Sequence, residues 1–231
     1  MTGLGARPGC SPGNAPCSTG NRLARRKART RAALLRAAQA FIAAGKTTVP
    51  ILEITQAADV GMGSFYNHFE SKEQLFQAAV EDALDRFGAL LDELTADLDD
   101  PALAFAQSFR LSGRLHRLRP ELSRVLLNNG LRLATSEHGL APRARRDIEA
   151  AVEAGRFTVR DPELAMITVA GAMLCLGQLL HNQPGRDAST ATDQVAEDLL
   201  RMLGLDADEA HELCRRPLPD LAADDPRDSA A

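Results

Sequence analysis

The stretch Asp59–Phe76, "DVGMGSFYNHFESKEQLF", gathers residue types that are scarce in the rest of the chain. The chain has one tyrosine, no tryptophan and eight phenylalanines, and this stretch contains the tyrosine and three of the phenylalanines. Phe65 and Phe69 are four residues apart, so on a helix they share one face and we expect them to point inward. Ser71 begins "SKEQ", which fits a capping box at the start of a helix. The pattern predicts a short helix over 62–69 followed by a longer one.

Two more helices are expected before this stretch. The segment 29–45, "RTRAALLRAAQAFIAAG", has one apolar stripe and ends in glycine, and 49–58, "VPILEITQAA", has a proline suited to a first helical turn. We expect Phe65 to pack on Phe41 of the first helix and Ile54 of the second. A turn of about four residues then separates the second and third helices. This spacing is typical of a helix-turn-helix, whose second helix enters the major groove of DNA.

The charge distribution supports a nucleic-acid partner. The net charge of the whole chain is −4, but the segment from Arg22 to Lys72 contains nine Lys/Arg and only three Asp/Glu. The run "NRLARRKARTR", residues 21–31, contains no acidic residue. Such a run is often only a solvated face, but here it adjoins the helix-turn-helix. It could neutralise DNA phosphates or reach the minor groove as an arm.

The segment Glu53–Phe76, "EITQAADVGMGSFYNHFESKEQLF", closely resembles the DNA-binding region of the tetracycline-repressor (TetR) family of bacterial transcription regulators. The resemblance covers about residues 28–80. It implies an all-α fold with an N-terminal three-helix helix-turn-helix DNA-binding domain and a larger helical ligand-binding and dimerisation domain. It also implies a cytoplasmic homodimer that binds double-stranded operator DNA as a repressor and is released by a small-molecule effector.

The resemblance assigns roles to residues around the third helix. Tyr66 and Lys72 match phosphate-contacting residues of the family. His68 matches a backbone-contacting position but is as well explained by a histidine bonded within the motif. Asn67 can bond adenine bidentately or lie in solvent. The expected DNA-contacting residues are Arg25, Arg26, Lys27, Thr47, Thr48, Met62, Gly63, Ser64, Tyr66, Asn67, His68 and Lys72.

The chain departs from the family pattern at three places. Asp59 stands where the turn often has glycine, but aspartate tolerates the left-handed conformation. Gly61 stands where a serine or threonine usually caps the third helix, and it has no hydroxyl to hold a phosphate. Val49–Pro50 stands where two threonines are common, so Thr47 or Thr48 is expected to substitute for the lost phosphate contact.

The remaining two thirds of the chain read as further helices with an acidic surface. Helices are expected to start at Pro101, Pro120 and Pro162, with others around 141–155, 190–205 and 206–216. The helix over 162–182 is apolar on more than one face. We therefore expect a homodimer through the helices around 162–182 and 192–204, the alternative being a helix buried within one chain.

An effector pocket is expected among the middle helices, although these residues are more often ordinary core. Arg110, His116 and Arg132 lie in apolar helices and are either surface residues or contacts to an anionic ligand. The candidate pocket residues are Phe87, Phe105, Phe109, Arg110, Leu126, Leu133, Met166 and Met173.

The expected domain limits are a disordered tail over 1–21, the helix-turn-helix domain over 22–70, the effector and dimerisation domain over 71–216, and a disordered tail over 217–231. We expect no secretory signal and no membrane partner, because the N-terminal residues lack an apolar core and no run of eighteen apolar residues occurs.

Other function classes fit less well. Catalytic and nucleotide-binding motifs are missing, so we expect no enzyme, metal or cofactor, and the four cysteines read as reduced thiols. Two alternatives remain open. One is a ligand-independent DNA-binding activator or architectural protein, and the other is a dimeric interaction module without DNA binding.

Overall fold

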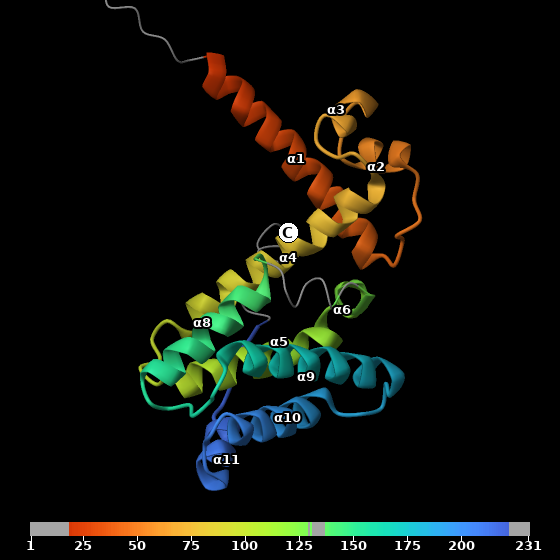
Figure 1. Cartoon of the computed structure of the whole chain (residues 1–231). Coiled ribbons are helices and arrows are strands. Elements are labelled where there is room, and N and C mark those ends of the chain that lie inside the picture. Colours follow the sequence, from red (N-terminus) through yellow and green to blue (C-terminus); the bar gives the residue numbers. More distant parts are fainter. Residues whose placement is uncertain (1–18, 129, 131–136, 222–231) are drawn as a thin grey trace, which may run out of the picture.

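The computed structural model describes residues 19–128, 130 and 137–221, and within these residues it contains helices and no strand (Figure 1). The predicted all-α fold is confirmed. The helices are α1 (Thr19–Ala43), α2 (Ile51–Ala57), α3 (Met62–Tyr66), α4 (Lys72–Thr95), α5 (Pro101–Leu118), α6 (Pro120–Asn128), α8 (Leu140–Glu153), α9 (Pro162–Asn182), α10 (Ala188–Met202) and α11 (Ala207–Arg215).

The molecule has two parts joined by α4. The head, residues 19–84, contains α1 to α3 and the first half of α4, and the body, residues 85–216, contains the other helices (Figure 1). One large cluster of buried apolar side chains lies in the body, and another fills the head and also includes Leu115 of α5 and Leu126 of α6. Because α4 contacts α1 in the head and α5 and α8 in the body, it sets how the two parts lie relative to each other.

The aromatic residues of α3 are buried as expected. Phe65 is fully buried and Phe69 nearly so, and both belong to the same cluster as Phe41 of α1 and Ile54 of α2. The helix itself is shorter than the predicted 62–69. It ends at Tyr66, and the backbone N–H groups of residues 68 and 69 both donate to the carbonyl oxygen of Phe65.

The capping box that the sequence indicates is present at the start of α4. Ser71 is the N-cap, and its hydroxyl oxygen accepts from the backbone N–H of Gln74 at 3.1 Å. In return, the side-chain oxygen of Gln74 accepts from the backbone N–H of Glu70 at 2.6 Å. These bonds satisfy N–H groups at the helix start that have no partner within the helix, so they fix the point where α4 leaves α3.

The turn between α2 and α3 also behaves as expected. Asp59 has a φ of 53°, in the left-handed region that aspartate tolerates. Gly61 is the N-cap of α3 and makes no side-chain capping bond, because it has no side chain. The start of α3 therefore depends on its packing against α1 and α2.

The structure describes only a part of each predicted tail. Residues 1–18 of the first tail and 222–231 of the second lie outside them. Residues 19–21 belong to α1, so this helix begins earlier than the sequence indicated. The reason is physical: residues 22–31 contain no Gly or Pro to stop the helix from extending backward.

In the body, α5 is the central helix. It contacts α4, α6, α8, α9, α10 and α11. Phe105 of α5 packs edge-on against Phe157 at a centroid distance of 5.4 Å. Aspartates cap the four helices whose starts the sequence marks with Asp: Asp100, Asp161, Asp187 and Asp206 accept backbone N–H groups of α5, α9, α10 and α11.

Within the described residues, α9 is the helix that is long and apolar enough, by length and composition, to cross a membrane. The core helix of a soluble protein passes the same test, and one third of the most apolar window of α9 is buried within the fold. Its buried side, which includes Met166, Val169 and Leu176, packs on the body. The absence of a membrane partner stays a prediction.

His116 is a buried core residue and lies away from solvent. Its Nδ1 lies 2.7 Å from the hydroxyl of Ser123, which in turn lies 2.8 Å from Nε2 of His181, so this chain of bonds joins α5, α6 and α9. Burial is the largest cause that lowers the pKa of His116 to about 4. The ring is therefore neutral at pH 7, and it serves the packing of three helices and does not face an anion.

Protonation of His116 should weaken the fold in mild acid. The unfolded chain binds this proton more tightly, because the ordinary pKa is 6.5, so the stabilisation is fully present above pH 6.5 and lost as the pH falls toward 4. We expect the free energy of unfolding in urea to fall over this window by up to about 3 kcal/mol. His116→Leu should flatten the pH dependence, whereas His211→Gln, at an exposed position of α11, should retain it. Equal pH slopes for wild type and His116→Leu would contradict the assignment.

Candidate nucleic-acid interface and ligand cavity

The outward face of α3 is formed by four residues. Met62, Gly63, Tyr66 and Asn67 are exposed, while Phe65 anchors the opposite face in the core. The exposed fractions of Tyr66 and Met62 are 59% and 40%. Ser64 is partly buried. The structure thus brings four of the expected DNA-contacting residues together on one surface, although their contact with DNA stays a prediction.

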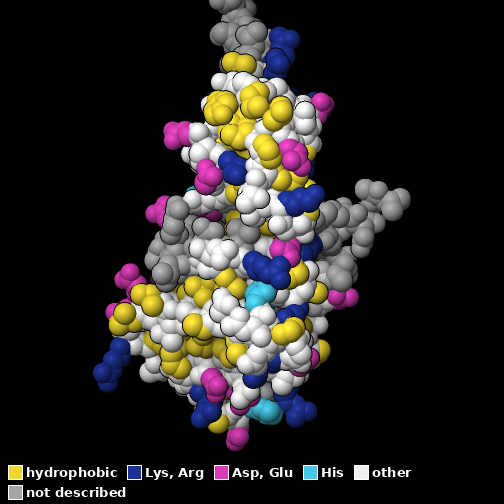
Figure 2. Space-filling view, turned by 90° about the vertical axis from the view of Figure 1, so that its right-hand side faces the viewer, with side chains coloured by type: hydrophobic (Ala, Val, Ile, Leu, Met, Phe, Trp, Pro, Cys, Tyr) yellow, Lys and Arg dark blue, Asp and Glu magenta, His cyan; other side chains and the backbone are white. Residues whose placement is uncertain are grey.

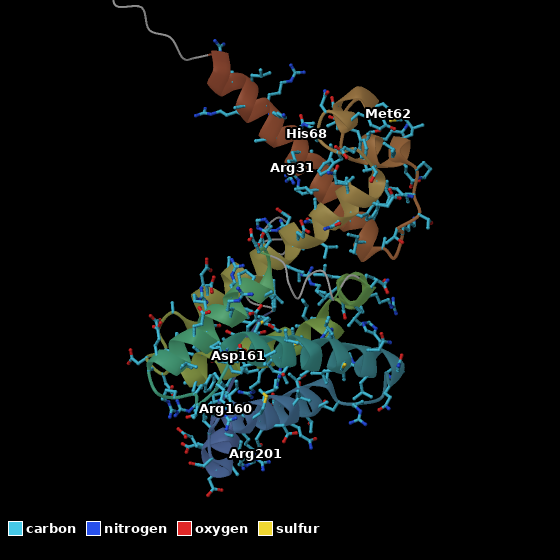
Figure 3. The ribbon with its side chains drawn as sticks, viewed as in Figure 1. Arg31, Met62, His68, Arg160, Asp161 and Arg201 are labelled. Atoms are coloured by element: carbon cyan, nitrogen blue, oxygen red, sulfur yellow. The ribbon has the colours of Figure 1, made fainter. Side chains whose placement is uncertain are left out.

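His68 lies between α3 and α1 and is mostly shielded from solvent. Figure 3 shows it near Arg31, whereas Met62 lies on the outer side of the head. Burial, and then the positive charges of Lys27 and Arg31, lower the pKa of His68. The guanidinium of Arg31 also lies over the Phe69 ring, 5.4 Å from its centroid. One side of α1 therefore presents its cations to the edge of α3.

The basic run forms the first turns of α1, which extend beyond the rest of the head (Figure 1). Arg25, Arg26 and Lys27 are all exposed, and the first buried residue of α1 is Leu34. An α-helix with its side chains is about 10–12 Å wide, whereas the minor groove is about 6 Å wide. As a helix this segment is too wide to enter the minor groove, so the phosphate backbone suits it better, and its contact with DNA stays a prediction.

The other expected contact residues lie at the edges of this surface. Thr47 and Thr48 are exposed before α2, and Lys72 is half-buried in the first turn of α4. A lysine beside a helix N-terminus is repelled by the positive end of the helix dipole. An anion that binds between the lysine ammonium group and the helix N-terminus would remove this repulsion. The head thus offers an uncharged α3 face with cations around it.

The body contains a cavity of about 110 Å³ between α4, α5, α8 and α9. Its wall is mostly apolar, and five of the predicted pocket residues contribute to it: Phe105, Phe109, Leu126, Met166 and Met173. Leu133 and Arg132 lie outside the described residues. The structure therefore brings together most of the predicted pocket.

Two predicted pocket residues lie elsewhere. Phe87 packs, half-buried, against the apolar cluster of the head. Arg110 is buried and pairs with Asp193 of α10 at 2.8 Å, and it also donates to the carbonyl oxygen of Arg216. A buried guanidinium needs a fixed counter-charge, and Asp193 supplies it within the protein. Arg110 consequently ties α5 to α10 and to the end of the body.

A group of four charged residues at the cavity was missed from the sequence. We call Asp92, Arg143, Arg146 and Asp147 the polar quartet, and three of them, all except Arg146, line the cavity. Asp92 of α4 accepts from Arg143 at 2.9 Å and from Arg146 at 2.7 Å, and Arg146 also donates to Asp147 at 2.8 Å. The signal in the sequence was the spacing of the three α8 residues, which places them on one helical face.

The quartet combines two different carboxyl groups. Burial raises the pKa of Asp147, and the hydrogen bond from Arg146 offsets only part of this effect. Burial also acts to raise the pKa of Asp92, but hydrogen bonds from Arg146 and Arg143 outweigh it and the pKa is lowered. Two carboxylates and two guanidiniums together carry no net charge. The quartet can therefore exchange hydrogen bonds with a polar ligand while the rest of the wall contacts its apolar surface.

Both surfaces involve α4. Leu84, Leu91 and Asp92 of this helix line the cavity, while Lys72 begins its first turn next to α3. Leu126 of α6 also lines the cavity and packs in the apolar cluster of the head. The cavity and the α3 surface are thus connected through a helix and through a packed cluster.

Comparisons with known proteins identify both parts of the chain. Residues 33–79 match the model "Bacterial regulatory proteins, tetR family", and residues 100–216 match the model "Tetracyclin repressor-like, C-terminal domain". A search of curated proteins finds no match.

Solved structures agree. The chain is 35% identical to RolR (NCGL1110), crystallised in complex with resorcinol, with a TM-score of 0.67 over 85% of this chain and 98% of that one. It is 21% identical to a TetR-family regulator from Pectobacterium atrosepticum, with a TM-score of 0.58 over 78% and 94% of the two chains. It is 15% identical to FadR from Bacillus subtilis, crystallised with stearoyl-CoA, with a TM-score of 0.56 over 73% and 96%.

The last two likenesses show the fold alone. The matched models and the likeness to RolR show more, because they span the helix-turn-helix and the body together. The chain belongs to the TetR family of transcription regulators, which act by binding DNA and not by catalysis.

Proposed function

We propose that this regulator is a homodimeric repressor whose operator binding is relieved by a small, neutral, hydroxylated aromatic molecule bound in the body cavity. The observation that carries the proposal is the position of α4, which lines the cavity at one end and supports the DNA-facing surface at the other. A DNA partner also favours a location in the cytoplasm.

The size of the cavity suits a single-ring ligand. Its volume is about 110 Å³. An engineered protein cavity of about 150 Å³ with an apolar wall binds benzene, so the two spaces are on the same scale. The side chains of Phe105, Phe109 and Met173 offer the apolar contacts that one ring needs. A long acyl chain would require much more room than this cavity provides.

The charge balance of the polar quartet favours hydroxyl groups on the ligand over a carboxylate. Each guanidinium already has a carboxylate partner, so an anionic ligand would bring an uncompensated charge to a mostly apolar cavity. A neutral hydroxyl can donate to Asp147 or Asp92 without this cost. RolR, 35% identical to this chain, was crystallised with resorcinol, which is a ring with two hydroxyl groups. Resorcinol is therefore the first ligand to test.

An exposed apolar face on α9 supports the dimer. On α9, Leu164 and Ile167 are 61% and 58% exposed, and Leu179 is also exposed. Met202, at the end of α10, is exposed as well. In Figure 2 hydrophobic side chains gather over the body as well as over the head. An apolar surface of this kind on a soluble chain usually marks an interface. Pairing of this face with itself across a two-fold axis would cover both copies.

Gly171 lies at helical spacing from Ile167 on α9, and a Cβ added to it would meet no atom within 4 Å. A glycine that faces open space within one chain lets two helices approach closely when a second chain covers it. The dimer would then hold two α3 surfaces at the separation of one turn of DNA, about 34–36 Å. A ligand that prefers another separation weakens DNA binding by its differential affinity, typically about 1–3 kcal/mol.

Substitutions in the head should separate base reading from phosphate binding. Asn67→Ala should reduce discrimination at particular base pairs by about 1–3 kcal/mol, because it removes an amide from the α3 face. Lys72→Ala should weaken binding to all sequences and reduce the salt slope by about one per protomer. Selection from random duplexes followed by titration at several salt concentrations measures both effects. Wild-type selectivity and wild-type affinity in both variants would show that α3 is not the reading element.

Resorcinol should bind the full chain and release selected DNA, whereas benzoate, of similar size but anionic, should do neither. Asp147→Asn keeps the shape of the side chain but removes its charge, and we expect at least a tenfold loss of resorcinol affinity by calorimetry with DNA binding retained. Asp198→Asn, at an exposed position of α10, is the matched control. Resorcinol binding without any change in DNA affinity would instead support a ligand-independent regulator.

Gly171→Glu should convert the dimer to a monomer. The added side chain meets open space within the protomer, so folding is retained, but it places a charge in the apolar interface. Gly185→Glu, also in open space but in the loop after α9, should remain dimeric. Analytical ultracentrifugation at several protein concentrations measures the oligomeric state of each variant. A dimeric Gly171→Glu with wild-type dissociation would rule out this face of α9 as the interface.

A further inference from the structure

We infer that the α3 face reads thymine through its 5-methyl group, with Met62 as the main contact, so that the centre of each operator half-site is rich in A·T pairs. This inference rests on the proposed DNA binding and adds which chemical group of the DNA is recognised. The supporting observations concern charge, the surroundings of Met62 and the other side chains on the same face.

The first observation is the position of the cations. Between Lys46 and Lys72 the sequence has no lysine or arginine, so α2, the turn and α3 contain none. The commonest specific contact in the major groove is an arginine or lysine bonded to the O6 and N7 acceptors of guanine. The helix-turn-helix formed by α2, the turn and α3 has no such side chain. The cations of Arg25, Arg26 and Lys72 lie on the flanking helices, where they suit phosphates.

His68 does not supply the missing charge. It is half-buried, and its neighbours Lys27 and Arg31 are both cationic. A positively charged imidazole at this position would be repelled by both of them. Guanine recognition by a cation is therefore not available from any described residue between 47 and 71.

The second observation is the setting of Met62. It is exposed, and it lies between Gly61 and Gly63, at each of which an added Cβ would meet no atom within 4 Å. The backbone on both sides of Met62 can thus approach another surface closely, and the exposed methionine side chain lies between these two open positions. Figure 3 shows Met62 on the outer side of the head, away from α1. A flexible thioether chain is well suited to contact a methyl group in a groove.

The third observation is the chemistry of the rest of the face. Tyr66, four residues after Met62, lies on the same side of α3, and its ring packs edge-on against Phe65 at 5.2 Å. Asn67 follows it and has an amide that can bond the N6 and N7 of adenine. Met62 and Asn67, both exposed at α3, thus offer one apolar side chain and one amide. These suit a thymine and an adenine, because the thymine methyl and the adenine edge both face the major groove.

The test uses the duplex that the full chain selects from a random pool. Each thymine of this duplex is replaced in turn by deoxyuridine, which keeps the O4 acceptor and lacks only the methyl group. Loss of one buried methyl contact should weaken wild-type binding about fourfold, and loss in both half-sites about tenfold or more. Replacing the same T·A pair by a 5-methylcytosine·guanine pair, which restores the methyl group, should recover part of the affinity.

Variants link the effect to Met62. Met62→Ala should bind thymine and uracil duplexes with equal affinity, whereas Met62→Leu should retain the preference for thymine. Lys72→Ala should bind both duplexes more weakly and keep the wild-type ratio. Leu118→Ala, at an exposed apolar position of the body, should behave as wild type in both respects. Circular dichroism of each variant confirms that the fold is retained.

The outcomes separate the inference from the function on which it rests. If no duplex is selected, the proposed DNA binding fails and the inference fails with it. If a duplex is selected but thymine and uracil versions bind equally at every position, or Met62→Ala keeps the wild-type ratio, only the inference is overturned. A selected half-site with a G·C centre would overturn it as well.

Discussion

The connection of the head to the body through α4 is the constraint on which the proposed function depends. The capping bonds between Ser71 and Gln74 fix the start of the helix beside α3, and Leu75 and Ala79 bury its first turns in the head. A helix of 24 residues is about 36 Å long, and its later turns line the body cavity. Under the proposed function, a ligand that displaces this wall would also move the α3 surface.

The exposed surface of the head has a charged part and an uncharged part. Cations occur on α1 and at the start of α4, where they surround the reading element, while α3 itself has an uncharged face. Affinity from phosphate contacts and selectivity from base contacts therefore come from different residues. The body shows a similar division, since the cavity has a mostly apolar wall with the polar quartet beside it, and in the proposed function the wall would provide ligand affinity and the quartet would limit which ligands are accepted.

The sequence predicted the parts of the structure that depend on local signals. Pro101, Pro120 and Pro162 mark helix starts, and the pair Phe65 and Phe69 faces the core as its spacing indicates. The early start of α1 was missed because a basic run has no distinctive end signal when its residues are all compatible with a helix. The short length of α3 was also missed, since the backbone leaves the helix at Asn67 while the aromatic spacing continues.

The candidate site was less predictable because it depends on contacts between distant segments. Phe105, Phe109 and Met173 were found from their apolar character. Arg110 was selected as a charged residue in an apolar helix, but its partner Asp193 lies 83 positions away in the sequence. The polar quartet was overlooked because Asp92 and Arg143 lie on different helices and look like ordinary surface charges. Only tertiary packing shows that they meet at a cavity.

Coupling between the cavity and the DNA surface is tested most directly by measuring both binding equilibria in each other's presence. Thermodynamic linkage requires that resorcinol weakens DNA binding by the same factor by which DNA weakens resorcinol binding. We expect both factors to be equal and to lie between about 5 and 150, the usual range for coupled sites. Full resorcinol occupancy with unchanged DNA affinity, and DNA saturation with unchanged resorcinol affinity, would contradict the account.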